Sequence, residues 1–285
     1  MSSEPAVQSA PPRREAAFAK MHGLGNDFVV LNVSTLARPL DELTIRRLAD
    51  RRLGIGCDQL LLLDTAKEPL RYRVFNADGG EVEQCGNGAR CLARYIADHG
   101  LAPGPEIRME SAGGPVTARV ADDDVSISLG VPHFAPADLP FDAPAEAITY
   151  EIEAGDENLA IGALSVGNPH AVIEVEDVDD APVANLGPQL ERHPRFPRRV
   201  NVGFLQVLAP DHCRLRVYER GAGETPACGT GAAAAAVWGI AARRLQSPVT
   251  VSLAGGDLVV EWAGPGEFVW LTGPATPVFE GRIEL

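Results

Sequence analysis

The chain has 285 residues, a formal net charge of −14 and five cysteines. This length fits two domains of ordinary size, and the acidic balance argues against a nucleic-acid partner, which needs a basic footprint. The longest apolar run is about a dozen residues, shorter than the ~20 needed to cross a bilayer, and no signal peptide opens the chain. With an odd cysteine count and no secretion signal, we expect reduced thiols in a cytoplasmic protein.

The first half of the chain predicts a disordered tail followed by strands and two helices. Residues 1–15 are rich in Ser, Pro, Ala and Arg, which is typical of disorder. The elements expected next are a strand, turn and strand over 18–33, a helix over 40–52, strands over 57–64 and 71–76, a helix over 86–99, and short strands over 107–111, 116–120 and 125–129. On the second helix, Arg90, Arg94 and Asp98 have helical spacing and are expected to form one polar stripe.

The second half repeats this order after a boundary over 131–147, which is rich in Pro, Ala and Asp. Its expected elements are a strand, turn and strand over 163–175, strands over 200–208 and 213–218, a helix over 232–242, and strands over 249–253, 258–262 and 268–271. The helix contains five consecutive alanines and no polar face, so we expect it to be buried on all sides.

Because strands outnumber helices and follow one another directly, the pattern predicts an α+β fold with antiparallel-rich sheets wrapped around central helices, rather than βαβ units. We place the first domain at 16–131 together with the C-terminal strand 274–285, and the second at 132–273.

A long internal repeat supports this division. When residues 71–89 are laid on residues 214–232 without a gap, nine of nineteen positions are identical, and Cys85 aligns with Cys228. The segment GNDFVV at 25–30 also matches GNPHAV at 167–172. A period of about half the chain is too long for a solenoid and indicates two homologous domains. Each would present a cysteine at the start of a helix, where free N–H groups lower the pKa of a thiol.

Other chemistries fit the sequence less well. No glycine pair completes a dinucleotide or P-loop motif. Cys85 and Cys91 lie six residues apart without a nearby histidine cluster, so we expect no metal site. Only Lys20 and Lys67 could form the Schiff base that a pyridoxal cofactor requires, and we expect no cofactor. A thiol hydrolase with Cys228 as nucleophile and His170 as base stays open, but it leaves the second, matching cysteine unexplained.

Two matched thiols suit the inversion of an amino-acid α-carbon. This reaction removes a proton from one face of the carbon and returns one to the other, so one group acts as base and the other as acid. Two domains related by a pseudo-two-fold axis would place the thiols on opposite sides of a substrate held between them. The same helix starts would bind the α-carboxylate and stabilise charge on the deprotonated carbon.

Five motifs carry a resemblance to a known family. They are KMHGLGNDF at 20–28, NADG at 76–79, QCGNGAR at 84–90, GNPH at 167–170, and ERGAGET at 219–225 leading to ACGTG at 227–231. With these motifs the chain resembles the diaminopimelate epimerase family from about residue 18 to its end. The resemblance implies interconversion of LL- and meso-diaminopimelate without pyridoxal phosphate, on the route to lysine and bacterial cell wall.

The resemblance also implies the site residues. Cys85 and Cys228 look like the acid/base pair, and His170 and Glu219 resemble the groups that tune the two thiols. Substrate binding falls to residues that offer amides, charges or helix-start N–H groups: Asn26, Gln59, Asn76, Gly86, Asn87, Asn168, Asn201, Glu219, Arg220, Gly229 and Thr230.

The family is typically a homodimer, so we expect one here. In the C-terminal strand, Phe279 stands where a family contact residue is usually Tyr, and Cys57 stands where the family usually has Phe. Two further readings stay open beside the epimerase: a related racemase of another amino acid such as proline, and a non-catalytic binding protein with the same fold.

Overall fold

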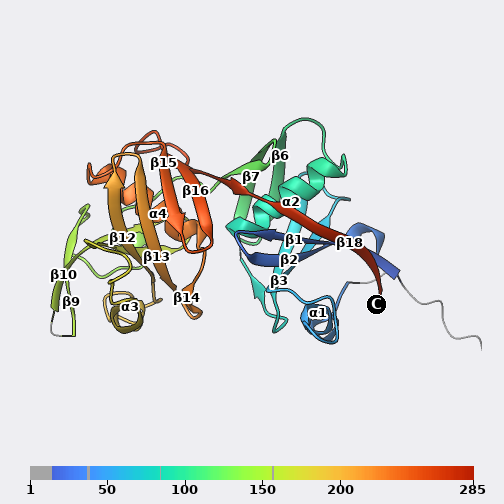
Figure 1. Ribbon diagram of the computed structural model, residues 1–285, viewed down its shortest axis with the longest axis horizontal. Coiled ribbons are helices and arrows are strands. Elements are labelled where there is room, and N and C mark those ends of the chain that lie inside the picture. The colour runs from blue at the N-terminus through green and yellow to red at the C-terminus, as the bar shows by residue number, and fades with distance from the viewer. Residues whose placement is uncertain (1–14, 37–38, 84, 156) are drawn as a thin grey trace, which may run out of the picture.

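The two halves of the chain form two lobes joined side by side (Figure 1). The structure, a computed structural model, describes residues 15–36, 39–83, 85–155 and 157–285. The expected tail at 1–15 therefore lies outside the described residues except for Glu15, which begins the first strand.

The first lobe contains eight strands and two helices in chain order. They are β1 (Glu15–Gly23), β2 (Asn26–Asn32), α1 (Glu42–Ala49), β3 (Gln59–Asp64), β4 (Leu70–Asn76), β5 (Glu81–Val82), α2 (Gly86–Asp98), β6 (Glu106–Ser111), β7 (Gly114–Ala121) and β8 (Asp124–Ser128).

The second half of the chain repeats this order and adds a strand at each end, of which the last pairs with β1 of the first lobe. Its elements are β9 (Tyr150–Ala154), β10 (Glu157–Ser165), β11 (Pro169–Glu174), α3 (Val183–Glu191), β12 (Asn201–Ala209), β13 (His212–Glu219), β14 (Gly223–Thr225), α4 (Gly229–Ala241), β15 (Val249–Leu253), β16 (Gly256–Glu261), β17 (Trp270–Pro274) and β18 (Thr276–Glu284). The β1–β8 segment thus corresponds to β10–β17, helix for helix. Helix α3 and strand β9 have no counterpart among the elements expected from the sequence.

The strands pair mainly in antiparallel fashion, as expected, but the expected absence of βαβ units is wrong. Four neighbouring pairs are parallel: β2 with β3, β4 with β6, β11 with β12, and β13 with β15. A helix lies between the two strands of each pair in the chain, because a parallel neighbour requires a crossover connection. These parallel pairs could not be predicted from the sequence, because the alternation of polar and apolar residues within a strand does not show which strands become its neighbours.

Helices α2 and α4 are the centres of the two lobes. Ten of the thirteen residues of α4 are buried, in line with its alanine-rich sequence. In α2 the expected polar stripe is wrong at its first member, because Arg90 is fully buried while Asp98 is exposed. The first turns of α2 run through the interior and only its last turn reaches solvent. One hydrophobic core contains side chains of both helices, such as Leu92 and Val237.

Two strand pairings tie the lobes together. Strand β8 of the first lobe pairs with β17 of the second, with Ile127 opposite Leu271. The last strand, β18, then leaves the second lobe and runs along β1 of the first (Figure 1). Since β8 and β17 are equivalent elements of the repeat, their pairing places the pseudo-two-fold axis at this seam.

Candidate active site

Each lobe holds one of the two matched cysteines immediately before its central helix. Cys85 is the N-cap residue of α2 and Cys228 is the N-cap residue of α4, both with extended backbone. Neither side chain caps its helix, so the helix-start N–H groups stay directed at the space in front of the thiol. The glycine at the third helical position makes room for this, since a Cβ on Gly231 would lie 3.2 Å from Cys228 Sγ.

The two helix starts meet at the seam between the lobes. A Cβ placed on Gly86 would lie 3.8 Å from Leu271 Cδ2, and one placed on Gly229 would lie 2.9 Å from the same atom. The Gly229 position is also 3.7 Å from Asn87 Oδ1 of the other lobe. One leucine of β17 therefore separates two N-termini that both favour anions.

In the first lobe, a short chain of amides leads away from the thiol. Cys85 Sγ lies 3.8 Å from Asn26 Oδ1, which also accepts a hydrogen bond from Asn87 Nδ2 at 3.4 Å. Asn26 is held in turn by Asp58, whose Oδ2 accepts from Asn26 Nδ2 at 3.0 Å. The structure thus brings the expected residues Asn26, Asn87 and Cys85 together.

The second lobe has the corresponding arrangement. Cys228 Sγ lies 3.7 Å from Thr230 Oγ1, which accepts from Asn168 Nδ2 at 3.4 Å. Asn168 Oδ1 is 2.9 Å from His170 Nε2. In the repeat, Asn168 corresponds to Asn26 and Thr230 to Asn87, so each thiol has an asparagine from a strand turn and a polar residue from its own helix.

Three further expected residues, Gln59, Asn76 and Asn201, lie at ends of the strands β3, β4 and β12. Gln59 lies opposite Asn76 and donates to its Oδ1 at 2.8 Å. Asn201, at the position that corresponds to Gln59, donates to Pro169 O at 3.0 Å and accepts from the Arg220 backbone N–H at 2.9 Å. Asn201, the first residue of β12, therefore holds the backbone at Arg220, directly after the end of β13.

Glu219 is the negative charge shared by both thiols. It accepts a hydrogen bond from Thr225 Oγ1, and its charge raises the pKa of Cys85 and of Cys228 alike. A carboxylate that acts on thiols of both lobes must face the space between them. The Arg220 guanidinium is exposed at the rim of this region and donates to Arg198 O at 3.3 Å.

The expected lowering of the thiol pKa is wrong for both cysteines. Burial raises the pKa of Cys85 to about 11, although the N–H groups of Gly88 and Asn87 act in the opposite direction. Burial, together with Glu219, also raises the pKa of Cys228. Desolvation disfavours the thiolate more strongly than the helix start favours it, and the sequence alone did not show how deeply the thiols lie.

His170 is neutral in this environment. It is 1% exposed, and burial, with the nearby charge of Arg220, lowers its pKa to about 3. Its visible contribution is the contact with Asn168, which fixes the amide beside Thr230 and Cys228.

Two carboxylates of this site were not anticipated from the sequence. Asp58 fixes Asn26, and its place directly before Gln59 in a predicted strand was the available signal. Glu191 is 1% exposed and accepts from the Gly221 backbone N–H at 3.1 Å, which supports the loop after Arg220. No motif marked Glu191, because it lies in the unexpected helix α3.

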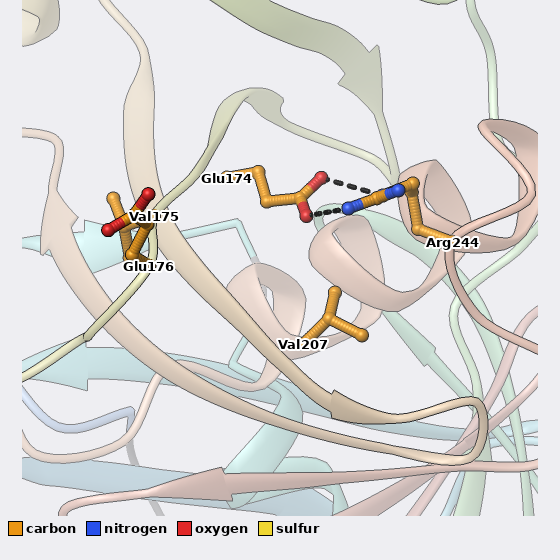
Figure 2. Close-up of a pocket in the computed structure, with 5 residues that line it drawn as sticks. All are labelled: Glu174, Val175, Glu176, Val207 and Arg244. Carbon is orange, nitrogen blue, oxygen red and sulfur yellow. Dashed lines mark hydrogen bonds and ion pairs between the residues drawn. The ribbon is translucent and has the colours of Figure 1, made fainter.

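Lys20 is ion-paired with Asp27 at 2.5 Å. Within the described ranges, no group of three or more His, Cys, Asp or Glu side chains is placed to hold a metal ion, and no helix is long and apolar enough to cross a membrane. A surface hollow elsewhere is lined by Glu174, Val175, Glu176, Val207 and Arg244 (Figure 2). Its Glu174–Arg244 ion pair is exposed, and none of the expected site residues lines it.

Comparisons with known proteins identify the family of the chain. The family model described as diaminopimelate epimerase matches residues 18–135 and 162–278. A diaminopimelate epimerase of Nitrosospira multiformis is 54% identical over 271 residues, covering 94% of this chain and 98% of that protein. One of Halorhodospira halophila is 55% identical over 272 residues, covering 94% and 95%.

A solved structure shows the same fold at much lower identity. A phenazine biosynthesis protein of the PhzF family from Bacillus anthracis superposes with a TM-score of 0.71 at 14% identity, covering 95% of this chain and 100% of that one. At this identity the likeness concerns the two-lobed architecture alone. The family match and the identity over nearly the full length establish more: this chain belongs to the diaminopimelate epimerase family.

Proposed function

We propose that this isomerase interconverts LL- and meso-diaminopimelate with Cys85 and Cys228 as its two acid/base groups. The observation that carries the proposal is the meeting of the two thiol-bearing helix starts at Leu271. One thiolate removes the α-proton from one face of the carbon, and the other thiol donates its proton to the opposite face. The roles exchange in the reverse direction, as a two-base inversion requires.

The helix starts supply the electrostatic part of the reaction. We infer that the N–H groups at Gly86, Asn87, Gly229 and Thr230 bind the α-carboxylate of the reacting end. When the proton leaves, negative charge moves onto that carboxylate, and preorganised N–H donors stabilise it most strongly in this state. Binding also removes water from the site, which strengthens each of these interactions.

The other polar residues read the substrate's amino and carboxylate groups. We infer that Arg220 binds the distal carboxylate through its two-pronged guanidinium. The amides of Asn26, Gln59, Asn76, Asn168 and Asn201, with Glu219, then serve the ammonium groups and the remaining oxygens. A proline racemase would not need the distal set, and relatives near 54% identity favour diaminopimelate.

The test is an NMR assay of LL-diaminopimelate with the reduced protein and no added pyridoxal phosphate. We expect meso product from the wild type. Each of Cys85→Ser and Cys228→Ser should be slower by about 10²–10⁴-fold, the usual contribution of a positioned acid or base. Proline serves as the substrate control. A folded, reduced sample that leaves diaminopimelate unchanged while it racemises proline would overturn the substrate assignment.

We also propose that two copies associate through strand β18. Within the described residues, the strand pairing given for β18 is the one with β1, so the other edge of its 277–283 stretch can accept a second strand. Val278 and Phe279 on this strand are 54% and 50% exposed. Phe18 fixes the Phe279 ring by an edge contact at 5.9 Å between ring centroids.

Sedimentation equilibrium tests this association. The wild type is expected at twice the 30.2 kDa mass of the chain, and Phe279→Glu at the mass of one chain. Leu208→Glu is the control, because Leu208 is equally exposed at 48% but lies on β12 of the other lobe. A monomeric wild type would contradict the proposal.

The thiol chemistry also bears on where the protein works. All five cysteines are free in the structure, and both proposed acid/base groups must stay reduced to act. We therefore propose a reducing compartment, the cytoplasm, as the site of activity.

A further inference from the structure

Arg90 is a charged side chain buried at the centre of the molecule. It lies at the start of the second turn of α2, five residues after Cys85, and is 0% exposed. Its Nη2 donates to Asn87 Oδ1 at 2.9 Å, and its Nε contacts Pro274 O at 3.5 Å. Arg90 therefore links the helix start of the first lobe to the end of β17, which belongs to the second.

The positive charge of Arg90 has no counter-ion in the part of the chain that the structure describes. Its two partners are an amide and a backbone carbonyl, and its Nη1 is buried without a hydrogen-bond partner. The ionisable groups that act on it through space are Cys91, Cys85 and Asp124. Burying an unpaired guanidinium lowers the stability of the fold. The stability of the fold therefore does not explain why an arginine occupies this core position.

The unpartnered nitrogen lies close to the start of α4, while the other terminal nitrogen of Arg90 contacts Asn87 at the start of α2. A Cβ on Gly229, the first residue of α4, would lie 3.9 Å from Arg90 Nη1. On the other side, a Cβ on Gly23 would lie 3.4 Å from Arg90 Nη2. The guanidinium thus contacts Asn87 of the first helix start and lies next to Gly229 of the second, the two residues whose N–H groups belong to the proposed carboxylate site.

The repeat shows that this cation is not a general requirement of the fold. In the alignment that places Cys85 on Cys228, Arg90 falls on Ala233, which is also 0% exposed. The same alignment places Asn76 on Glu219. The first lobe therefore carries an extra positive charge and the second an extra negative one, at positions where the repeat is otherwise matched.

We propose that Arg90 is a positioning residue of the reaction: a fixed buried cation that holds Asn87 and places positive charge beside the two helix starts and Cys85. The proposal rests on the two-thiol function described above. The substrate's reacting carboxylate gains negative charge when the α-proton leaves, and Arg90 stabilises that charge without moving. Its field also favours the thiolate at Cys85 over that at Cys228, where Ala233 takes its place. Removal of Arg90 should therefore lower kcat more than it raises KM.

The experiment compares Arg90→Met and Arg90→Lys with Arg94→Met. Arg94 lies one turn further along α2, contacts Asp122 O and Asp98, and touches none of the site residues. We expect Arg90→Met to reduce kcat by about a hundredfold with KM changed less than threefold, as for loss of a fixed transition-state donor. Arg90→Lys keeps the positive charge but loses the planar guanidinium that contacts both Asn87 and Pro274 O. Its kcat should lie between those of the wild type and Arg90→Met. Arg94→Met should keep the wild-type kcat.

A second readout needs no diaminopimelate turnover. In a Cys228→Ser background, the rate at which iodoacetamide alkylates Cys85 at pH 8 follows the thiolate fraction. Loss of a neighbouring cation should lower this rate by about tenfold, the effect of one pKa unit. Mere loosening of the helix start would expose the thiol and raise the rate.

The outcomes separate the two proposals. A lower alkylation rate in Arg90→Met beside an inactive wild type would support the charge effect of Arg90 on Cys85 but overturn the proposed function, and with it the role of Arg90 in that reaction. An active wild type with unchanged kcat and alkylation in both Arg90 variants would overturn the Arg90 role alone. If Arg90→Met does not fold, Arg90→Lys tests the hydrogen bond from Arg90 to Asn87. A wild-type kcat in this variant would contradict a role for that bond in the reaction. A reduced kcat with an unchanged rate of Cys85 alkylation would support it.

Discussion

At the residue scale, the two thiols have equal positions but unequal surroundings. Both are N-cap residues, both face a polar residue on their own helix, and both are made less acidic by burial. The charge that breaks the symmetry is Arg90, which lowers the pKa of Cys85 alone of the two thiols, whereas Glu219 at the end of β13 raises the pKa of both. A reaction that needs one base and one acid at rest is served by such a difference.

Glu219→Gln tests the negative half of this charge pattern. Because the Glu219 carboxylate raises the pKa of both thiols, its neutral replacement should lower both values. More thiolate is then present at pH 8, so alkylation by iodoacetamide should speed up by about tenfold, as one pKa unit would give. Glu224→Gln is the control, since Glu224 is exposed and paired with Arg216. An alkylation rate equal to that of the control would contradict the assignment.

The sequence predicted most residues of the site, but not how deeply they are buried or how burial changes the pKa of the two thiols. The repeated C-G-x-G-A pattern and the family motifs located both cysteines and the amides around them. Burial of the thiols could not be read from local sequence, and it reverses the expected direction of their pKa shift. Arg90 was misplaced for the same reason: its helical spacing with Arg94 and Asp98 is real, but its part of α2 crosses the core.

At the element scale, the fit between the two helix starts depends on the absence of side chains. Gly86 and Gly229 occupy equivalent positions at the first turn of α2 and α4. A Cβ on Gly86 would meet neighbours at ordinary distances of 3.6 Å and more, whereas one on Gly229 would come within 2.9 Å of Leu271. Leu271 is 0% exposed, so it has little room to yield.

Gly229→Ala and Gly86→Ala therefore form a matched pair of variants. Both keep the backbone N–H that binds the carboxylate. We expect Gly229→Ala to displace Leu271 and separate the helix starts, with a cost of about 1–3 kcal/mol for overpacking and a kcat lowered by roughly tenfold. Gly86→Ala should stay within a factor of two or so in the same assay. Equal activities would show that Leu271 does not set the spacing.

The hairpin β1–β2 depends on one buried lysine. Lys20 binds Asp27 at 2.5 Å and also donates to Gly56 O, while Arg51 holds the other side of Asp27 at 2.7 Å. Asp27 Oδ1 in turn accepts from the Asp58 backbone N–H at 2.8 Å. This network therefore fixes the loop that aligns Asn26 with Cys85.

Lys20→Met should destabilise the protein by about 3 kcal/mol, because it leaves a partly buried carboxylate without one of its two cations. The measurement is the free energy of unfolding in urea. The chain offers a direct control in its one other lysine, the exposed Lys67, whose replacement by Met should change the free energy by less than about 0.5 kcal/mol. Equal effects of the two substitutions would contradict a structural role for Lys20.

Element prediction from the sequence succeeded where the pattern is local. The alanine run gave the buried helix α4, and alternation gave β4 and β13. Parallel neighbours such as β4 and β6 were missed, because their pairing depends on a crossover through α2 rather than on either strand's own pattern. Helix α3 was missed because its segment contains Gly187 and Pro188, which are weak helix formers.

At the scale of the whole molecule, the repeat explains how two domains build one site. Equivalent strands β8 and β17 pair at the seam, so the helix starts that follow Cys85 and Cys228 approach each other from opposite sides. The length of the repeat predicts two such lobes. It does not predict that β8 and β17 pair, that Arg90 reaches Pro274, or that Leu271 lies beneath both helices, because these contacts join residues with no pattern in common.

The central claim is that the two thiols act on opposite faces of one carbon, and deuterium incorporation tests it most directly. LL-diaminopimelate is incubated with the reduced wild type in D₂O and sampled at low conversion by NMR. The acid thiol carries solvent deuterium, while the base holds the proton taken from the substrate. The account therefore predicts deuterium at the inverted carbon of the meso product and little in the recovered LL substrate. A product that keeps its original proton would contradict it, because a single group would then have moved that proton from one face to the other.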